Sequence, residues 1–339
     1  MGMKEPWRYR NKAQYPVGMA GGAVVLGFYR KGTHQIVPAV DCWLQPVIAN
    51  KIAKKVRELV VKYRVPAYNE RTGGGMLRHA LIKNAFATGE IMVVLVTNGD
   101  SFPDGMRIAR DLVGAFPEIK SVVQNINRSR DNVILGNTNA VLWGKDSITE
   151  KIGSLQFKIS ANSFFQVNPV QLQTLYSKAV DYAGLSWKEL VLDAYCGVGS
   201  LTLFLAKKAK MVYGIESVSE AIVNAKENAK LNGIENVEFL TGTVEKVLPN
   251  LLKRKLALDV AVLDPPRSGC EEVVLKALAD SKVRRIVYVS CNPGTLARDL
   301  KILDGFGYKT HEVQPVDMFP HTHHVECVVK VERKINGLQ

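Results

Sequence analysis

The chain has 339 residues, enough for two domains that each bury a core of their own. With 47% hydrophobic and 23% charged residues it has the composition of a soluble globular protein, which excludes a disordered or fibrous chain. It contains no apolar run of the ~18 residues that a membrane span needs, and its first residues lack the apolar core of a signal peptide, so we expect a cytoplasmic protein without membrane association.

The positive charge is unevenly distributed. The net charge is +13, and residues 1–90 alone carry 15 Lys and Arg against 5 Asp and Glu, a net charge of +10. The remaining 249 residues carry 30 and 27, a net charge of only +3. A solvated basic face is one interpretation, but the concentration of charge in one part of the chain favours a polyanionic partner.

Residues 1–147 are predicted to form an α+β domain with a basic surface. Strands are indicated at residues 24–30, 77–85 and 91–97, each bounded by turn residues. Residues 46–63 have the apolar spacing of an amphipathic helix, with lysines and arginines at the other positions. A basic surface on this domain would suit RNA binding.

Residues 148–339 are predicted to form a second domain, in which short apolar runs alternate with helical stretches. The runs predict strands at residues 191–194, 211–215, 237–240, 258–263 and 286–289. The stretches predict helices at residues 201–209, 219–232, 244–252 and 271–279. This alternation is typical of a Rossmann-like α/β fold, a parallel sheet with helices on both faces. Residues 310–316 and 325–331 have no helix between them, which predicts a closing antiparallel hairpin.

A glycine-containing turn follows the first strand of the second domain. It reads Asp193-Ala194-Tyr195-Cys196-Gly197-Val198-Gly199 and leads into a helix, so that unpaired backbone amides can meet a ligand there. Glu216 ends the next strand, placed to take two ribose hydroxyls, and Asp264 ends the fourth. Thr202 stands where the dinucleotide fingerprint needs a third glycine, which favours S-adenosylmethionine over NAD. The alternative is that these are only turn and capping residues.

Cys291 and Glu326 are the candidates for reaction chemistry. Cys291 follows a buried strand and precedes Pro293 at a predicted helix start, where the positive end of the helix dipole would lower the pKa of a thiol. Glu326 and Cys327 begin the last strand and point to opposite faces, because side chains alternate along a strand. We expect Glu326, and not Cys327, to face the cofactor.

Metal binding is not expected. The cysteines form no C-x-x-C pair, which argues against both a disulfide framework and a self-contained zinc site. They are Cys42, Cys196, Cys270, Cys291 and Cys327. His321, His323 and His324 lie close together, but no cysteine or carboxylate at a suitable spacing completes a site. Loop positioning or substrate contact is the favoured role for these histidines.

Five ordered motifs resemble those of the RNA uracil-5-methyltransferase family, whose members make 5-methyluridine in ribosomal or transfer RNA. The motifs are F-F-Q-V-N at 164–168, D-x-Y-C-G-x-G at 193–199, D-P-P-R at 264–267, S-C-N-P at 290–293 and D-M-F-P-H-T-x-H-x-E at 317–326. The resemblance covers residues 157–331 well and residues 7–41 more loosely. It implies a class I S-adenosylmethionine-dependent methyltransferase domain behind an RNA-binding domain.

The resemblance implies a role for individual residues. Cys291 would be the nucleophile and Glu326 the general base. The residues expected to bind S-adenosylmethionine are Gln166, Tyr195, Gly197, Glu216 and Asp264. The ribosomal branch of the family commonly reads D-M-F-P-x-T before its glutamate, as here, whereas the tRNA branch tends to D-Q-F-P-Y-T. The resemblance therefore favours 23S rRNA over tRNA as the partner, and no protein partner is evident.

Two features depart from the family pattern. Many rRNA-type members begin with a small β-barrel RNA-binding domain and hold an iron-sulfur cluster with four cysteines, three of which precede the region that matches Trp7. Only Cys42 occupies a plausible fourth position here, so we expect no cluster and interpret the chain as a truncated or shortened relative. Thr243 stands where an acidic residue near the adenine is expected.

Three alternatives stay open beside the favoured one. An amino-group methyltransferase usually ends its D/N-P-P motif in an aromatic residue, where Arg267 stands here. An RNA cytosine-5-methyltransferase typically carries a cysteine after the fourth strand, where this chain has Pro265-Pro266. A noncatalytic RNA-binding relative would have no need of Cys291 and Glu326.

Overall fold

The computed structural model describes residues 1–39, 41–254 and 256–334, which form two compact units. The N-terminal unit comprises Trp7–Lys151 and Lys158–Pro169. The C-terminal unit comprises Met1–Pro6, Ile152–Phe157 and the described residues from Val170 onward. The chain therefore crosses between the units more than once, and the boundary is not a single point between residues 147 and 148. The first residues join the C-terminal unit because the Met1 carbonyl accepts a hydrogen bond from the Asp317 amide at 3.0 Å.

The N-terminal unit is built on a seven-stranded sheet in the order β3-β2-β1-β4-β5-β6-β7. Its strands are β1 (Lys12–Ala20), β2 (Ala23–Tyr29), β3 (Ile36–Pro38), β4 (Leu77–Asn84), β5 (Ile91–Thr97), β6 (Ile119–Ile126) and β7 (Thr138–Gly144), and its helices are α1 (Val47–Lys62) and α2 (Gly105–Ala115). Only the pairing of β5 with β6 is parallel. The apolar faces of both helices pack on this sheet, and every residue of the central strands β4 and β5 is buried.

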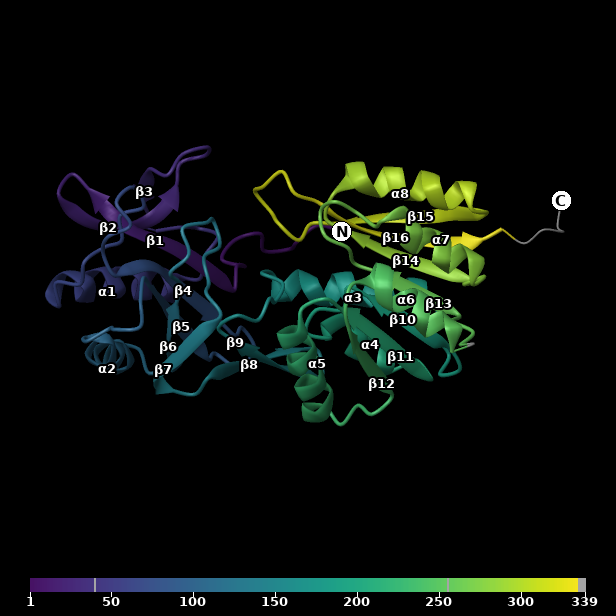
Figure 1. The fold of residues 1–339 in the computed structure, drawn as a ribbon, viewed down its shortest axis with the longest axis horizontal. Coiled ribbons are helices and arrows are strands. Elements are labelled where there is room, and N and C mark those ends of the chain that lie inside the picture. The colour runs from purple at the N-terminus through teal and green to yellow at the C-terminus, as the bar shows by residue number, and fades with distance from the viewer. Residues whose placement is uncertain (40, 255, 335–339) are drawn as a thin grey trace. The chain divides into compact units, whose positions relative to one another are not determined.

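The C-terminal unit confirms the Rossmann-like prediction (Figure 1). Its strands are β10 (Leu190–Ala194), β11 (Met211–Glu216), β12 (Val237–Thr241), β13 (Val260–Leu263), β14 (Arg285–Ser290), β15 (Tyr308–Val316) and β16 (Glu326–Arg333). Its helices are α3 (Pro169–Ala183), α4 (Ser200–Ala206), α5 (Ser219–Leu231), α6 (Val244–Lys253), α7 (Glu272–Asp280) and α8 (Pro293–Gly305). The order is β12-β11-β10-β13-β14-β16-β15, with β10 to β14 parallel and β15 and β16 closing the sheet as an antiparallel pair.

Two further strands, β8 (Ser147–Ile152) and β9 (Leu155–Ser160), form a separate two-stranded sheet. No helix in the described part of the chain is both long and apolar enough to cross a membrane.

The sheet order of the C-terminal unit determines where a ligand can bind. The order reverses between β10 and β13, and the loops after these parallel strands leave from the same edge of the sheet. A doubly wound sheet binds its ligand outside the carboxyl ends of its strands, at such a switch point. The residues that follow β10, β11, β13 and β14 are therefore the ones to inspect.

Candidate active site

The turn between β10 and α4 combines an open side with a tightly packed side. Gly197 and Gly199 have φ values of 54° and 78°, in the left-handed region that favours glycine. A Cβ on Gly197 would meet nothing within 4 Å, which leaves room for a ligand. A Cβ on Gly199 would lie 3.1 Å from Ala225 Cβ and from Phe239 Cζ. The second glycine is therefore required for packing against α5 and β12.

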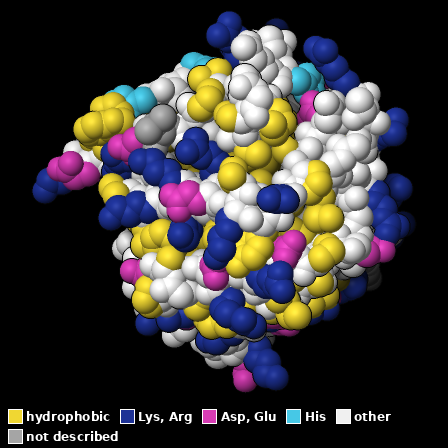
Figure 2. All heavy atoms as spheres, turned by 90° about the vertical axis from the view of Figure 1, so that its left-hand side faces the viewer, with side chains coloured by type: hydrophobic (Ala, Val, Ile, Leu, Met, Phe, Trp, Pro, Cys, Tyr) yellow, Lys and Arg dark blue, Asp and Glu magenta, His cyan; other side chains and the backbone are white. Residues whose placement is uncertain are grey.

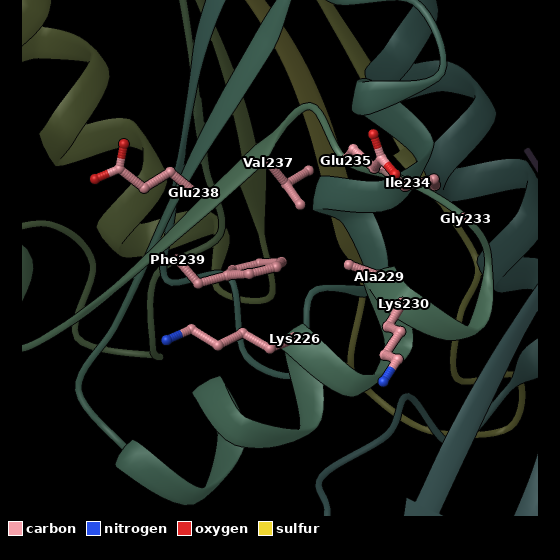
Figure 3. Close-up of a pocket in the computed structure, with 9 residues that line it drawn as sticks. All are labelled: Lys226, Ala229, Lys230, Gly233, Ile234, Glu235, Val237, Glu238 and Phe239. Atoms are coloured by element: carbon pink, nitrogen blue, oxygen red, sulfur yellow. The ribbon is translucent and has the colours of Figure 1, made fainter.

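Phe239 also forms part of a groove between α5 and β12, at the outer edge of the sheet. Figure 3 shows its ring pointing from β12 toward Ala229 of α5. The groove has a volume of about 480 Å³, and it is lined by Lys226, Ala229, Lys230, Gly233, Ile234, Glu235, Val237, Glu238 and Phe239. None of the predicted site residues lines it. The groove is linked to the site only through the Phe239 ring, which packs against Gly199.

This packing gives a first prediction, which compares Gly199→Ala with Gly233→Ala. Gly233 has φ 62°, and a Cβ there would meet nothing within 4 Å. Gly233→Ala should therefore lower the free energy of unfolding only by the cost of a left-handed backbone for an L-residue, about 1–2 kcal/mol. Gly199→Ala should lose a further ~1–3 kcal/mol, because its new methyl group overpacks the contact with Phe239. Urea unfolding measures both losses, and equal losses would contradict the packing role.

Three acidic residues lie around the glycine turn and the adjacent strand ends. Asp193 is buried and accepts a hydrogen bond from Thr202 Oγ1 at 2.5 Å, and its burial raises its pKa to about 7. One carboxylate oxygen of Glu216 accepts a hydrogen bond from the Gly197 amide at 3.1 Å. Asp264 follows β13, and burial raises its pKa to about 7. Glu216 thus lies against the turn, and its binding to a ribose stays a prediction.

These groups fit S-adenosylmethionine. The open side of Gly197 gives a nucleoside access to backbone, and the Glu216 carboxylate beside it can accept hydrogen bonds from hydroxyls. Buried carboxyl groups with raised pKa values are stabilised in their charged form by a nearby cation, such as a sulfonium. Asp193 and Asp264 supply such groups. Tyr195, with φ 67°, packs partly against the core of the unit, and its part in cofactor binding stays a prediction.

Cys291 and Glu326 are brought together by the pairing of β14 with β16. Ser290 lies opposite Cys327 in this antiparallel register, so one further step places Cys291 opposite Glu326. Residues directly opposite on antiparallel strands have Cα atoms roughly 4.5–5.5 Å apart. The Glu326 side chain is only 4% exposed, while Cys327 packs into the hydrophobic core on the other face. A thiol and a buried carboxyl therefore lie near enough to interact electrostatically at the ligand-binding edge of the sheet.

The electrostatics of this pair correct one expectation from the sequence. Burial raises the pKa of the Cys291 thiol, and the carboxylates of Glu326 and Asp264 raise it further, whereas the guanidinium of Arg267 lowers it. The net shift of the thiol pKa is therefore upward, whereas the sequence led us to expect a lowered pKa; the contribution of the helix dipole by itself stays a prediction. The start of α8 is instead capped by Asn292, whose side-chain oxygen accepts a hydrogen bond from the Gly294 amide at 3.0 Å.

Glu326 shares this environment. Burial and the neighbouring Asp264 raise its pKa to about 8, and Arg267 partly offsets the rise. The backbone carbonyl of Arg267 accepts hydrogen bonds from Asn292 Nδ2 at 3.0 Å and from Thr295 Oγ1 at 3.3 Å, so the loop after β13 is tied to the start of α8. This cation is held where it acts on both the thiol and the carboxyl.

Comparison with known proteins identifies the family of the chain. Residues 76–334 match the family model described as tRNA (Uracil-5-)-methyltransferase. The chain is 51% identical over 338 residues to an uncharacterized RNA methyltransferase of Oceanobacillus iheyensis. The aligned region covers 99% of this chain and 74% of that protein. It is also 51% identical over 333 residues to an uncharacterized RNA methyltransferase of Bacillus cereus, covering 98% and 72%.

A solved structure agrees over nearly the whole chain. The Pyrococcus abyssi tRNA (uracil-54, C5)-methyltransferase in complex with S-adenosyl-L-homocysteine superposes with a TM-score of 0.82 at 30% identity, and covers 97% of this chain and 77% of that one. The chain belongs to the RNA uracil-5-methyltransferase family. It is therefore an RNA (uracil-C5)-methyltransferase, and the family implies S-adenosylmethionine as its methyl donor.

The other cysteines of the methyltransferase are outside this pair. Cys196, Cys270 and Cys327 are buried, and burial raises the pKa of the Cys270 thiol to about 12. Cys42 is half-buried in the N-terminal unit. Across residues 1–39, 41–254 and 256–334 no three His, Cys, Asp or Glu side chains are grouped as a metal site. The absence of an iron-sulfur cluster stays a prediction.

Sequence reasoning missed a buried network behind Cys291. The Asp299 carboxylate on α8 accepts hydrogen bonds from the Tyr288 hydroxyl at 2.6 Å and from the Cys270 amide at 2.8 Å. Asp299 is 0% exposed and also pairs with Arg298 at 2.7 Å. It joins β14, α8 and the loop after β13, the segments that flank Cys291 and carry Arg267. The R-D pair that follows S-C-N-P in the sequence was the available signal.

Gln166, the fifth expected cofactor ligand, belongs to the N-terminal unit. Its segment, Lys158–Pro169, is held to that unit by two side chains. Lys83 is 5% exposed, and its Nζ donates to three backbone carbonyls between residues 160 and 163 at 2.7–3.0 Å. Asn11 Nδ2 donates to the Gln166 carbonyl at 2.9 Å. The role of the Gln166 side chain stays a prediction.

The histidine loop lies beside Arg267, and Thr243 lies at the start of a helix. The rings of His323 and His324 lie 4.1 Å apart, and His324 Nε2 lies 3.4 Å from an Arg267 nitrogen. The histidine loop therefore contacts the cation that acts on the reactive pair. Thr243 begins α6 as its N-cap residue, and its carbonyl accepts the first bonds of that helix.

Proposed function

We propose that this methyltransferase modifies uracil C5 in 23S rRNA, with Cys291 as nucleophile and Glu326 as base. The family establishes S-adenosylmethionine-dependent methylation of uracil C5 in RNA. The observation that carries the residue roles is the β14–β16 register, which opposes a thiol and a buried carboxyl at the ligand-binding edge. The D-M-F-P form of the last motif supports the ribosomal substrate.

The chemistry explains why both residues are needed. Uracil C5 is too weakly nucleophilic to take a methyl group unaided. The Cys291 thiolate adds to C6, which turns C5 into the nucleophilic carbon of an enolate. The bound cofactor supplies the electrophilic methyl group. The Glu326 carboxylate then accepts the C5 proton, and elimination of the Cys291 sulfur restores the aromatic ring and frees the enzyme.

The environment of Glu326 suits a base. Because burial and Asp264 raise its pKa to about 8, its carboxylate form binds a proton more strongly than an ordinary glutamate does. The same burial excludes water from the place where the proton is taken up. The carboxyl must be ionised before it acts, so the site is expected to work better at mildly alkaline pH.

We expect kcat/KM to rise with pH between about 7 and 9 for this reason. Cys291, whose pKa lies above its ordinary value, and Glu326, whose pKa is about 8, both act in their deprotonated forms. Arg267→Met removes the cation that lowers both pKa values, so its profile should move to higher pH. Initial rates across this range measure the effect. A profile that falls with rising pH, or an unshifted Arg267→Met profile, would count against these assignments.

The N-terminal unit supports RNA binding. Figure 2 shows Lys and Arg side chains spread over the face of this unit, with fewer Asp and Glu. Exposed cations of α1 include Lys51, Lys54, Arg57 and Lys62. A base must be splayed out of its stack to reach the half-buried Cys291 thiol beside the buried Glu326, so an unpaired loop or bulge is the expected target. Electrostatic binding of this kind should weaken steeply as salt concentration rises.

A tRNA substrate is the second candidate, favoured by the name of the Pyrococcus abyssi neighbour. The two candidate substrates are distinguished by measuring kcat/KM on unmodified 23S rRNA fragments and on unmodified tRNA transcripts at one fixed salt concentration. We expect the rRNA fragments to be preferred. A preference for tRNA would replace the ribosomal proposal and leave the roles of Cys291 and Glu326 intact.

A further inference from the structure

Two tryptophans form an exposed aromatic corner on the N-terminal unit. Trp43 is 61% exposed and Trp7 is 45% exposed, although large aromatic side chains are buried on average. Their ring centroids lie 5.9 Å apart, with the ring planes at 73°. An exposed aromatic ring offers a face on which a planar ligand group can stack.

The corner is held rigidly by Arg8. The guanidinium lies 4.9 Å from the centroid of the Trp43 ring, donates to both Asp41 oxygens at 3.0 and 3.2 Å, and donates to the Cys42 carbonyl at 2.7 Å. The Arg8 amide donates to the Trp43 carbonyl at 2.8 Å. Arg8 has φ 57°, a conformation that a non-glycine residue keeps only when its surroundings impose it. The Trp43 ring is thus oriented before any ligand arrives.

The charge around the corner favours an anionic ligand. Asp41 is paired with Arg8, and Lys54 on α1 is near enough to the Asp41 carboxylate to interact with it electrostatically. Lys51 and Lys54 are exposed on the first turns of α1, which begins four residues after Trp43. Aromatic rings beside basic side chains are the usual means of binding single-stranded nucleic acid, in which bases stack on rings and phosphates meet cations.

We propose that Trp43, with Trp7 beside it, is a stacking platform for an unpaired base of the RNA substrate, separate from the site of methylation. The proposal rests on the proposed function only in taking RNA as the substrate. A base in a duplex already stacks on its neighbours and offers no free face, so the platform should select single-stranded segments. It would fix a loop or bulge on the N-terminal unit by a contact that is insensitive to base identity.

The test measures binding directly, by anisotropy of end-labelled RNA at about 0.1 M salt. The probes are an oligouridylate of about 12 nucleotides and an RNA duplex of the same length. Trp43→Ala should weaken binding of the oligouridylate roughly 5- to 100-fold, and binding of the duplex by less than about twofold. Trp43→Phe, which keeps a stacking ring, should restore most of the affinity. Trp187→Ala is the control, because Trp187 is 66% exposed but lies in the C-terminal unit.

The platform would be overturned by unchanged binding in Trp43→Ala, by equal weakening of single-strand and duplex binding, by no rescue in Trp43→Phe, or by an equal loss in Trp187→Ala. Sedimentation of the wild type and of Trp43→Ala tests whether the tryptophans instead join two copies of the chain. If the wild type is a dimer and the substitution dissociates it, the platform is also overturned. Methylation is assayed separately. Weaker RNA binding without any methyl transfer by the wild type would contradict the proposed function and keep the platform, whereas methylation with unaffected binding would do the opposite.

Discussion

Replacing Cys291 with alanine should abolish methyl transfer while the protein stays folded. The thiolate is the group that activates C5, and no other described thiol lies opposite Glu326 in the β14–β16 register. Losing a covalent nucleophile should lower kcat by at least roughly 10³-fold. Incorporation of labelled methyl groups into RNA under single-turnover conditions measures this loss, and the thermal unfolding midpoint checks the fold.

Cys327→Ala is the matched control for this variant. Cys327 lies next to Glu326 in the chain but packs into the hydrophobic core on the other face of the sheet. We expect its alanine variant to keep methyl transfer within a few-fold, with some loss of stability from the smaller side chain. Undiminished activity in Cys291→Ala, or the same loss in both variants, would contradict the nucleophile assignment.

Glu326→Gln should trap the enzyme on its RNA as a covalent complex. Glutamine keeps the size of the side chain but cannot accept the C5 proton, so addition and methyl transfer can proceed while elimination of Cys291 stalls. The substitution also removes a carboxyl whose burial costs free energy, so the protein should remain stable. A denaturing gel with labelled RNA and cofactor should show a band of enzyme joined to RNA.

The double variant Cys291→Ala, Glu326→Gln separates this adduct from nonspecific crosslinking. Without the thiol no band should form, even after long incubation with cofactor. A band that persists in the double variant would show that the trapped complex is not a Cys291 adduct. Normal release of methylated RNA by Glu326→Gln alone would show that Glu326 is not the base.

The C-terminal unit was the part of the fold that sequence patterns predicted best. Its strands are short, apolar and separated by helices, so periodicity and turn residues identify β10 to β14 and the hairpin of β15 and β16. The N-terminal unit was harder. Strands β1, β3, β6 and β7 were not predicted. β1 contains Pro16 and Gly18 and β7 is largely exposed, and both owe their conformation to pairing with neighbouring strands.

The candidate site was predictable in its residues but not in its electrostatics. Cys291 and Glu326 could be named from motif and strand alternation. The pKa of the thiol could not, because its sign depends on which carboxylates and cations converge from other strands. Asp264 follows β13 and Arg267 follows it in the same loop, while Glu326 comes from β16. Only the folded sheet places these charges together, and the net effect of burial and of these charges is a raised thiol pKa.

The exchange of segments between the units was equally invisible in the sequence. Residues 1–6 join the C-terminal unit through backbone hydrogen bonds near residues 315–317, and such bonds carry no side-chain pattern. Gln166 likewise belongs to the N-terminal unit because Lys83 and Asn11 bind the backbone of its segment.

The most direct test of the account is the identity of the methylated nucleoside. The protein is incubated with unmodified RNA and S-adenosylmethionine labelled in its methyl group, and the RNA is digested to nucleosides and separated. We predict that the wild type places the label in 5-methyluridine and that Cys291→Ala places none. Label in cytidine or adenosine, or 5-methyluridine formed at the normal rate by Cys291→Ala, would contradict uracil-C5 methylation through a Cys291 adduct.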